Sequence, residues 1–220
     1  VGFFVGISAG ATVTISQFFG GKRMKEVREA IHTAIALAIA GGIIIMVIGM
    51  ILAPSVLTLM KTPEETMEGS VLYLRIYFCG MIGNLIYNIG SGILRAMGDS
   101  KKPLYFLIAS CLVNVVLDIV LVAAAKMGVA GVALATILSQ AFSAVLVCGT
   151  LVKFPEEYRL RLKSIRFHGW VFKRIIAIGL PAGCQSLMYS LSNALIQANV
   201  NSFGTDTVAA WTAYGKIDSL

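Results

Sequence analysis

Residues 104–125 form an almost entirely apolar segment with the sequence LYFLIASCLVNVVLDIVLVAAA. Its length is enough for a helix to cross the hydrocarbon core of a bilayer, which takes about 20 residues at 1.5 Å each. Asp118 is the only acidic residue well inside any long apolar segment of the chain. A charged side chain at a helix centre costs about 2.5–3.5 kcal/mol, so it typically marks an ion or substrate path. Asn114 lies one turn earlier on the same face, so the two residues predict a site for a small cation or a proton.

Composition places the whole chain in a membrane. Of its 220 residues, 57% are hydrophobic and 13% are charged, and the mean hydropathy is +0.84. A soluble protein of this length has no core large enough to bury that much apolar surface. The net charge of +7 does not indicate nucleic acid, because the basic residues stand in short clusters between apolar segments. The four cysteines lie in separate apolar segments without CxxC or Cys/His spacing, so we expect neither a disulfide nor a structural metal site.

Apolar segments alternate with short polar loops along the chain. The predicted spans cover residues 1–19, 30–60, 71–95, 104–125, 129–152 and 172–201, and a seventh begins at 207. Pro54 predicts a kink or an end in the second span, and Pro181 predicts a bend or a local break in the sixth. Gly90 and Gly92 predict a loosened helix in the third. Because the chain begins and stops inside apolar stretches, we expect an internal piece of a longer transporter-like chain.

The first span carries two stripes of small residues. Gly2, Gly6 and Gly10 recur every four residues, and such a GxxxG pattern lets a neighbouring helix approach closely. A second stripe, of hydroxyl side chains, ends beside Gln17 and consists of Ser8, Thr12 and Ser16. Hydroxyls in membrane helices often bond their own backbone, so this stripe either does so or faces a cavity.

The third span has a polar face inside the membrane. Asn84, Asn88 and Ser91 recur at i, i+4 and i+7. This face either forms hydrogen bonds between helices, worth about 0.6 kcal/mol each, or lines the same cavity as Asp118. In the sixth span, polar residues recur every four positions and wind around the helix. The candidates for the substrate cavity are Asn84, Ser91, Gln17, Gln185 and Tyr189.

Loop charges set the orientation of the chain. Of the 18 Lys and Arg residues, 14 lie in three groups, at 22–28, 95–102 and 153–174, which fall on one side of the membrane. The positive-inside rule makes that side cytoplasmic. We expect the third group to belong to an amphipathic connector on the membrane surface, with Trp170 and Phe172 as interfacial anchors. His32, beside the first group, is expected to be an interfacial residue and not a proton relay.

Four stretches also match a known family. They read GISAGATVTISQFFGGKR at 6–23, YLRI at 73–76, GILRAMGDSKKP at 92–103 and IGLPAG at 178–183. In this order they resemble the multidrug and toxic compound extrusion (MATE) family over essentially the whole chain. The resemblance implies an all-α polytopic membrane protein with two pseudo-symmetric six-helix lobes. On that template, 1–152 are helices two to six of the first lobe, 153–172 are the cytoplasmic connector, and 173–220 are helix seven and the start of helix eight.

The resemblance implies a cation-coupling site in the first lobe. Prokaryotic members use an Asn and an Asp one turn apart on helix five, a Thr on helix six and an Asn on helix four. The matching residues here are Asn114, Asp118, Thr136 and Asn88. The family's site also uses an acidic residue on helix one, which this chain does not include. Other branches carry a Glu early in helix seven, where this chain has Gln185, which argues against a coupling site in the second lobe.

The family exports cationic and amphipathic compounds in exchange for Na⁺ or H⁺ by alternating access. We therefore expect a secondary antiporter, and no enzyme, in the cytoplasmic membrane. Its expected partners are cationic drugs and the lipid bilayer, with no nucleic acid and no obligate protein partner. No cofactor is expected besides the coupling ion, which is Na⁺ at Asp118 and Asn114 or a proton on the same groups.

Other functions fit the residues less well. A lipid-linked sugar flippase or polysaccharide exporter of related architecture needs cationic side chains for pyrophosphate, and the spans carry none deep inside. An intramembrane enzyme is disfavoured because HExxH does not occur and the apolar spans carry no paired carboxylates, so no catalytic residue is assigned. A purely structural membrane protein leaves Asp118 unexplained.

Overall fold

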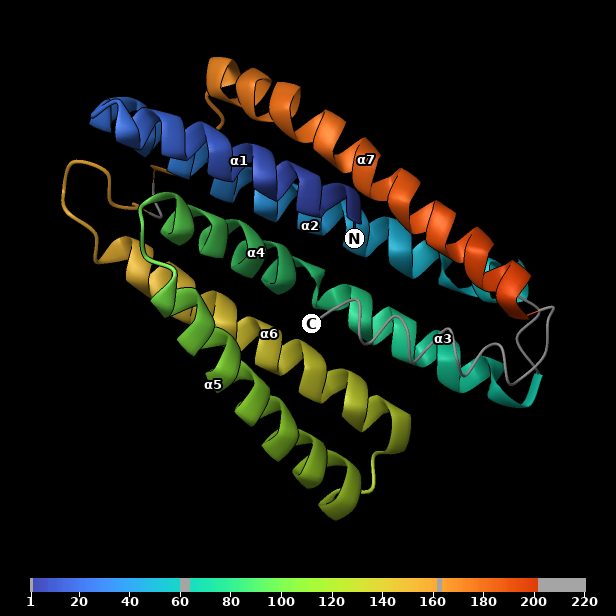
Figure 1. Cartoon of the computed structure of the whole chain (residues 1–220). Helices are drawn as coiled ribbons and strands as arrows, with labels where there is room; N and C mark the ends of the chain where they lie inside the picture. The colour runs from blue at the N-terminus through green and yellow to red at the C-terminus, as the bar shows by residue number, and fades with distance from the viewer. Residues whose placement is uncertain (1, 60–63, 162–163, 202–220) are drawn as a thin grey trace.

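The structure is a computed structural model that describes residues 2–59, 64–161 and 164–201. These residues form long helices that run side by side in one bundle, without a strand among them (Figure 1). In chain order the elements are α1 (Gly2–Gly20), α2 (Met24–Leu59), α3 (Glu64–Cys79), α4 (Met81–Ala96), α5 (Lys101–Asp118), the π-helix η1 (Ile119–Ala124), α6 (Gly128–Val152) and α7 (Gly169–Asn201). The predicted seventh span and the start of helix eight fall at 202–220, outside the described residues.

The membrane-length helices match the predicted spans. Within the described residues, four helices are long and apolar enough to cross a membrane: α2, α5 with η1, α6 and α7. The pair α3 and α4 makes a fifth if it is taken as one span bent by 44°. The chain is thus a multi-pass helical protein, as the apolar segments predict.

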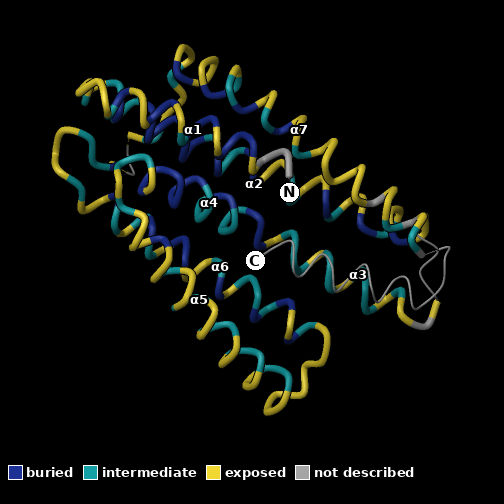
Figure 2. The backbone as a smooth tube through the Cα atoms, viewed as in Figure 1, coloured by how far each residue is buried: buried dark blue, intermediate teal, exposed yellow. Residues whose placement is uncertain are grey.

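The buried core lies toward one end of the bundle, where α1, α2, α4 and the segment after α6 meet (Figure 2). Phe18, Ile31, Ile93 and Leu151 are among its fully buried side chains. The opposite ends of the helices expose apolar side chains, and Pro103 is the only residue of α5 that is buried. This exposure suits helices that face lipid, because lipid tails are as apolar as leucine.

The third predicted span is broken, at a place that the sequence analysis did not indicate. Gly80 separates α3 from α4, and its N–H donates to the carbonyl of Tyr77 at 3.0 Å. A Cβ at Gly80 would lie 2.5 Å from Cγ2 of Ile137 in α6, so the glycine lets α6 approach the backbone at the break. Gly90 and Gly92, where loosening was predicted, lie inside the regular helix α4.

The two prolines do not interrupt their helices. Pro54 lies inside α2, which continues to Leu59, and Pro181 lies inside the continuous helix α7. The predicted end or break at these positions is therefore wrong as far as helix continuity goes. One carbonyl near Pro54 finds a side-chain donor, because Thr58 Oγ1 donates to the Pro54 oxygen at 3.0 Å. The carbonyl that loses its helical N–H donor at Pro54 is that of Met50, four residues earlier, so this bond adds to the helix after the proline and does not replace the missing one.

All three basic groups meet at the same end of the bundle, called the basic end below. The α1–α2 loop, the α4–α5 loop and the segment between α6 and α7 lie there together (Figure 1). A direct bond joins the third group to the start of α2, just after the first group, since Trp170 Nε1 donates to Glu29 Oε2 at 3.0 Å. The positions of the basic residues thus agree with the one-sided pattern that the loop charges predict.

Candidate ion and substrate site

Asp118 lies at a change in helix type. It is the last residue of α5, and the six residues after it form the π-helix η1. In η1 the N–H of Ala125 donates to the carbonyl of Val120 at 2.9 Å. Short π-helical segments occur frequently at functional sites, because the wider turn redirects the side chains beside it. The uniformly apolar sequence of η1 contains no signal that could have predicted this change.

The carboxylate of Asp118 has an unused acceptor atom. Its Oδ1 is enclosed by the protein and accepts no hydrogen bond from any residue that the structure describes. An enclosed polar atom without a partner is costly, and such atoms are few in folded proteins. Ser91 Oγ and Gln140 Oε1 are in the same condition. Asp118 is the one member of this set that can carry a charge.

Thr136 of α6 lies level with Asn114 of α5. The two helices run antiparallel, and their register follows from two contacts. Ser110 Oγ donates to the carbonyl of Ser139 at 2.7 Å, and a Cβ at Gly131 would lie 3.1 Å from the Leu121 oxygen. Counting from these contacts places Asn114, Asp118 and Thr136 along one pair of neighbouring helices. The Thr136 hydroxyl donates to Val132 O at 2.9 Å, which leaves its oxygen lone pairs as acceptors.

Asn88 lies elsewhere in the bundle. Helices α4 and α6 run parallel, with Gly80 against Ile137 and Gly90 against Val147. This register puts Asn88 level with about residue 145, roughly 13 Å along α6 from Thr136 at 1.5 Å per residue. Its Nδ2 donates to the Asn84 carbonyl at 2.8 Å and to Asn84 Oδ1 at 3.0 Å. The structure therefore does not bring Asn88 to the carboxylate, and its part in a shared site stays a prediction.

The polar face of α4 packs against the hydroxyl stripe of α1. Ser8 Oγ donates to the Asn88 carbonyl at 3.2 Å, and a Cβ at Gly92 would meet Thr12 Oγ1. Three hydroxyls of α1 also bond the backbone of their own helix: Thr12, Thr14 and Ser16. The backbone of α4 at Asn88 and Gly92 thus borders α1, on the same helix as Asn84 and Ser91, and the hydroxyl stripe supplies helix–helix and backbone contacts.

The remaining cavity candidates lie apart from Asp118. Gln17 is at the basic end, where its Oε1 accepts a hydrogen bond from Arg174 Nη2 at 2.8 Å. Gln185 and Tyr189 are exposed residues of α7, and Tyr189 is 69% accessible. The described helices do not enclose these residues in one cavity with Asp118.

Glycines bring α1 and α7 into backbone contact, as the GxxxG pattern in the first span predicts. A Cβ at Gly10 would lie 2.5 Å from the Ile175 oxygen and 2.6 Å from the Gly179 nitrogen. A Cβ at Gly6 would clash with the backbone of Gly183. The partner glycines on α7 have the same four-residue spacing, and the sequence analysis did not assign them a role. Glycine on both helices allows the closest approach that two helices can make.

The oxygen atoms of the predicted site suit a hard cation or a proton. Asn114, Asp118 and Thr136 offer amide, carboxylate and hydroxyl oxygens, the ligand type that hard cations prefer. No group of three His, Cys, Asp or Glu side chains that could hold a metal ion occurs within the described part of the chain. A bundle of membrane-length helices with an ionisable residue inside is typical of membrane transporters.

The family follows from the sequence. The family described as MatE matches residues 1–120, more than half of the chain, and the chain belongs to this family. It is 29% identical over its full length to the probable multidrug resistance protein YoeA of Bacillus subtilis, of which it covers 49%. It is 31% identical over 99% of its length to the probable multidrug resistance protein YpnP of the same organism, of which it covers 48%. The chain thus spans about half the length of these curated relatives.

Solved structures show the same fold. The crystal structure of MATE in the bent conformation aligns with 98% of this chain and 49% of its own, with a TM-score of 0.89 at 23% identity. The outward-facing conformation of a multidrug resistance MATE family transporter aligns with 99% of this chain and 49% of its own, with a TM-score of 0.88 at 22% identity. These similarities confirm the expected all-α membrane fold and its coverage of about half of such a transporter.

Proposed function

We propose that this chain is part of a cation-coupled antiporter that exports cationic and amphipathic small molecules by alternating access. The coupling ion is Na⁺ or H⁺, and the membrane is the cytoplasmic membrane. Membership of the MatE family and the names of the multidrug resistance relatives support this proposal. Solved members in inward-facing and outward-facing conformations support alternating access as the family's mode of transport.

The enclosed and unpartnered Oδ1 atom of Asp118 is the observation that carries the proposal. Its enclosed Oδ1 has no donor in the described structure, so a cation or a proton is the natural partner for its negative charge. Asn114 and Thr136 add neutral oxygens along the same helix pair. A purely structural role would leave the cost of this group unexplained, because a satisfied polar core residue has its hydrogen bonds made within the protein.

In the proposed coupling, the ion and the drug compete for the negative charge of Asp118. Na⁺ or H⁺ entering from outside neutralises Asp118, changes the packing around it and releases the drug outward. The ionised carboxylate then favours binding of a cationic drug from inside. Ion and drug need no direct contact, because each shifts the same conformational equilibrium through its preference for one charge state.

The test is efflux of a fluorescent cationic dye from cells that carry the full-length protein, comparing wild type with Asp118→Asn. We expect export to fall at least tenfold while the amount of protein in the membrane is unchanged. Repeating the assay with and without Na⁺ identifies the ion. Unchanged export by the variant would show that Asp118 is only a buried polar residue and would overturn the mechanism.

A second pair of variants tests which neighbours belong to the site. Thr136→Val removes the hydroxyl level with Asn114 and is expected to raise the ion concentration needed for half-maximal export about tenfold. Asn88→Ala is the matched control on α4, some distance along the bundle. If the Asn88 variant shifts the ion dependence as strongly as the Thr136 variant, the site extends to α4 in the working protein.

A further inference from the structure

A basic cavity of about 490 Å³ lies at the basic end, between the first turns of α2 and the segment that precedes α7. Its ionisable lining comes from two parts of the chain that are far apart in sequence: Lys25, Arg28, Glu29 and His32 on α2, and Arg161, Arg166 and His168 before α7. Four of these side chains are permanently cationic, and Glu29 is the single carboxylate. That carboxylate already accepts a hydrogen bond from Trp170. The cavity therefore has an excess of positive charge.

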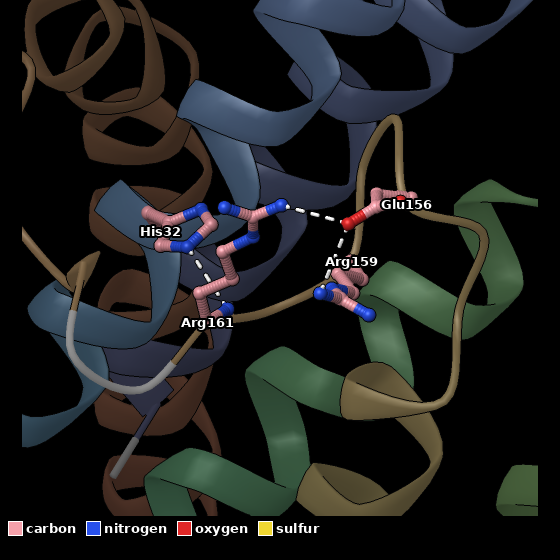
Figure 3. Close-up of polar contacts among 4 residues, drawn as sticks. All are labelled: His32, Glu156, Arg159 and Arg161. Atoms are coloured by element: carbon pink, nitrogen blue, oxygen red, sulfur yellow. Dashed lines mark hydrogen bonds and ion pairs between the residues drawn. The ribbon is translucent and has the colours of Figure 1, made fainter.

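Hydrogen bonds hold the two walls of the cavity together. His32 is buried, and its Nε2 accepts a hydrogen bond from the backbone N–H of Arg161 at 3.1 Å (Figure 3). On the same wall, the backbone N–H of His168 donates to Thr33 Oγ1 at 3.2 Å, and Thr33 is fully buried. The side chain of Arg161 pairs with Glu156 at 3.1 Å, as does Arg159. These bonds fix the backbone of the two walls relative to each other, while the side chains of Lys25, Arg161 and Arg166 are exposed.

An apolar groove of about 510 Å³ lies farther along α2, and it shares no lining residue with the cavity. The residues that line it are Leu37, Ala40, Gly41 and Ile44 on α2, and Phe167, Gly169 and Phe172 at the start of α7. Gly41 lies nine residues beyond His32, which is roughly 13 Å along the helix at 1.5 Å per residue. The same two chain segments line both spaces, so charge gives way to apolar surface in the direction of the hydrocarbon core.

We propose that the cavity and the groove together bind one anionic phospholipid. The phosphate lies among Lys25, Arg28 and Arg161, and an acyl chain lies in the groove beside Phe172. Basic pockets on the cytoplasmic side of membrane helices are suited to anionic headgroups, and guanidinium groups bind phosphate oxygens with charge-assisted hydrogen bonds. A soluble phosphate compound would fill the cavity but leave the groove unused. The lipid would link α2 to the start of α7 at the point where the two walls meet.

The experiment measures lipid binding to the purified full-length protein after delipidation in detergent, by native mass spectrometry and by the shift in thermal unfolding temperature. The probes are phosphatidylglycerol, phosphatidylcholine and soluble glycerol phosphate. We expect phosphatidylglycerol to bind and to raise the unfolding temperature, with little effect of the other two. The double variant K25Q/R28Q should bind phosphatidylglycerol about 30-fold more weakly, since each basic side chain near an anionic surface contributes roughly a fivefold factor.

Matched variants separate the cavity from general charge effects. R95Q/K101Q removes two exposed basic side chains of the α4–α5 region at the same end of the bundle and should bind as wild type does. Gly169→Leu adds an apolar side chain at a position that lines the groove and where an added Cβ meets nothing within 4 Å, and it should weaken lipid binding at least fivefold. Gly149→Leu on α6, which is equally unobstructed, is its control.

Two results would overturn the proposal. Equal stabilisation by glycerol phosphate and phosphatidylglycerol would show that the cavity takes a free phosphate compound. Equal losses in K25Q/R28Q and R95Q/K101Q would show that the lipid senses only the overall charge of this face. Because binding is measured without transport, neither result depends on the antiport mechanism proposed above.

Discussion

The imidazole of His32 joins two segments that are 129 residues apart, through the hydrogen bond that its Nε2 accepts from the N–H of Arg161 (Figure 3). Its Nδ1 lies 2.7 Å from the carbonyl of Arg28 in the preceding turn. A carbonyl can only accept, so Nδ1 carries the proton and donates, and Nε2 is left with the lone pair that Arg161 needs. The neutral Nδ1–H tautomer satisfies both partners at once.

This relationship predicts that His32→Phe destabilises the protein. The substitution leaves the Arg161 N–H and the Arg28 carbonyl without their side-chain partner, which costs about 1–3 kcal/mol for a buried group. Thermal unfolding in detergent measures the loss, and trypsin should cut the segment 153–168 faster. His32→Gln, whose amide oxygen can accept from Arg161, should lose less. If Phe and Gln unfold at the wild-type temperature, the hydrogen bond contributes nothing to stability.

The contact between α1 and α7 predicts a strong effect of one methyl group. Gly6→Ala places a Cβ against the backbone of Gly183, and the two helices must move apart. Overpacking of this kind costs about 1–3 kcal/mol. The control is Gly149→Ala in α6, where a Cβ meets nothing within 4 Å and alanine favours the helix. The unfolding temperature should fall for the first variant and stay or rise for the second; the same change in both would disprove the close contact.

The break between α3 and α4 predicts a coupled pair of substitutions. Gly80→Ala brings a Cβ to 2.5 Å from Ile137 Cγ2 and should destabilise the protein by about 1–3 kcal/mol. Ile137→Ala removes that methyl group, so the double variant should be more stable than the sum of the single effects predicts, by at least about 0.5 kcal/mol. A double-mutant cycle on unfolding free energies gives this number. Strict additivity would mean that the two residues do not touch.

The contacts of Asp99 with Lys102, at the start of α5, predict that the stability of the protein depends on pH. Its Oδ1 accepts from the backbone N–H of Lys102 at 3.1 Å, and its Oδ2 lies 2.7 Å from Lys102 Nζ. The hydrogen bonds and charge of Lys102 hold the pKa of the Asp99 carboxyl below its ordinary value. Because the pKa of this carboxyl is lower in the folded protein than in the unfolded chain, its ionised form stabilises the fold. This stabilisation is complete at pH values above the ordinary aspartate pKa of about 4, and it is lost as the pH falls through the pKa of the folded state.

The variant Asp99→Asn tests this dependence, because it does not titrate. It should be less stable than wild type at pH 7, by about 1 kcal/mol or less, since both side chains are partly exposed. The difference in unfolding temperature should shrink as pH falls below about 4. Lys101→Gln, which leaves the ion pair intact, serves as the control. A difference between Asp99→Asn and wild type that is constant from pH 7 to pH 3 would contradict the assignment.

The positions of the spans and of the Asn114–Asp118 pair could be predicted because they depend on local sequence. Apolar runs of membrane length indicate helices, and a spacing of four residues places two side chains on one face. The position of Asn88 along the bundle axis relative to Asp118 could not be predicted, because it depends on how far one helix is shifted along another. The break at Gly80 likewise depends on Ile137, which lies 57 residues later in the chain.

Other features needed the folded chain for a different reason. The stripe with Gly6 and Gly10 indicates a close contact with another helix. It does not indicate that the partner is α7, because any helix with small residues could fill that role. The basic cavity is formed by α2 and the segment before α7, which are far apart in the sequence. Read separately, each of these basic clusters indicates only which side of the membrane its loop lies on. The π-helix after Asp118 has the same apolar composition as the α-helix before it, so no residue type distinguishes them.

The contact between α1 and α7 has a mechanical consequence. Side chains that interlock as ridges and grooves oppose rolling of one helix on another, because each step requires rotamer changes. At Gly6, Gly10, Gly179 and Gly183 the two surfaces are backbone alone. We therefore expect α7 to roll on α1 at this point with fewer rotamer changes than at an interlocked contact, while the hydrogen bond from the N–H of His168 to Thr33 Oγ1 holds the residue before α7 beside α2.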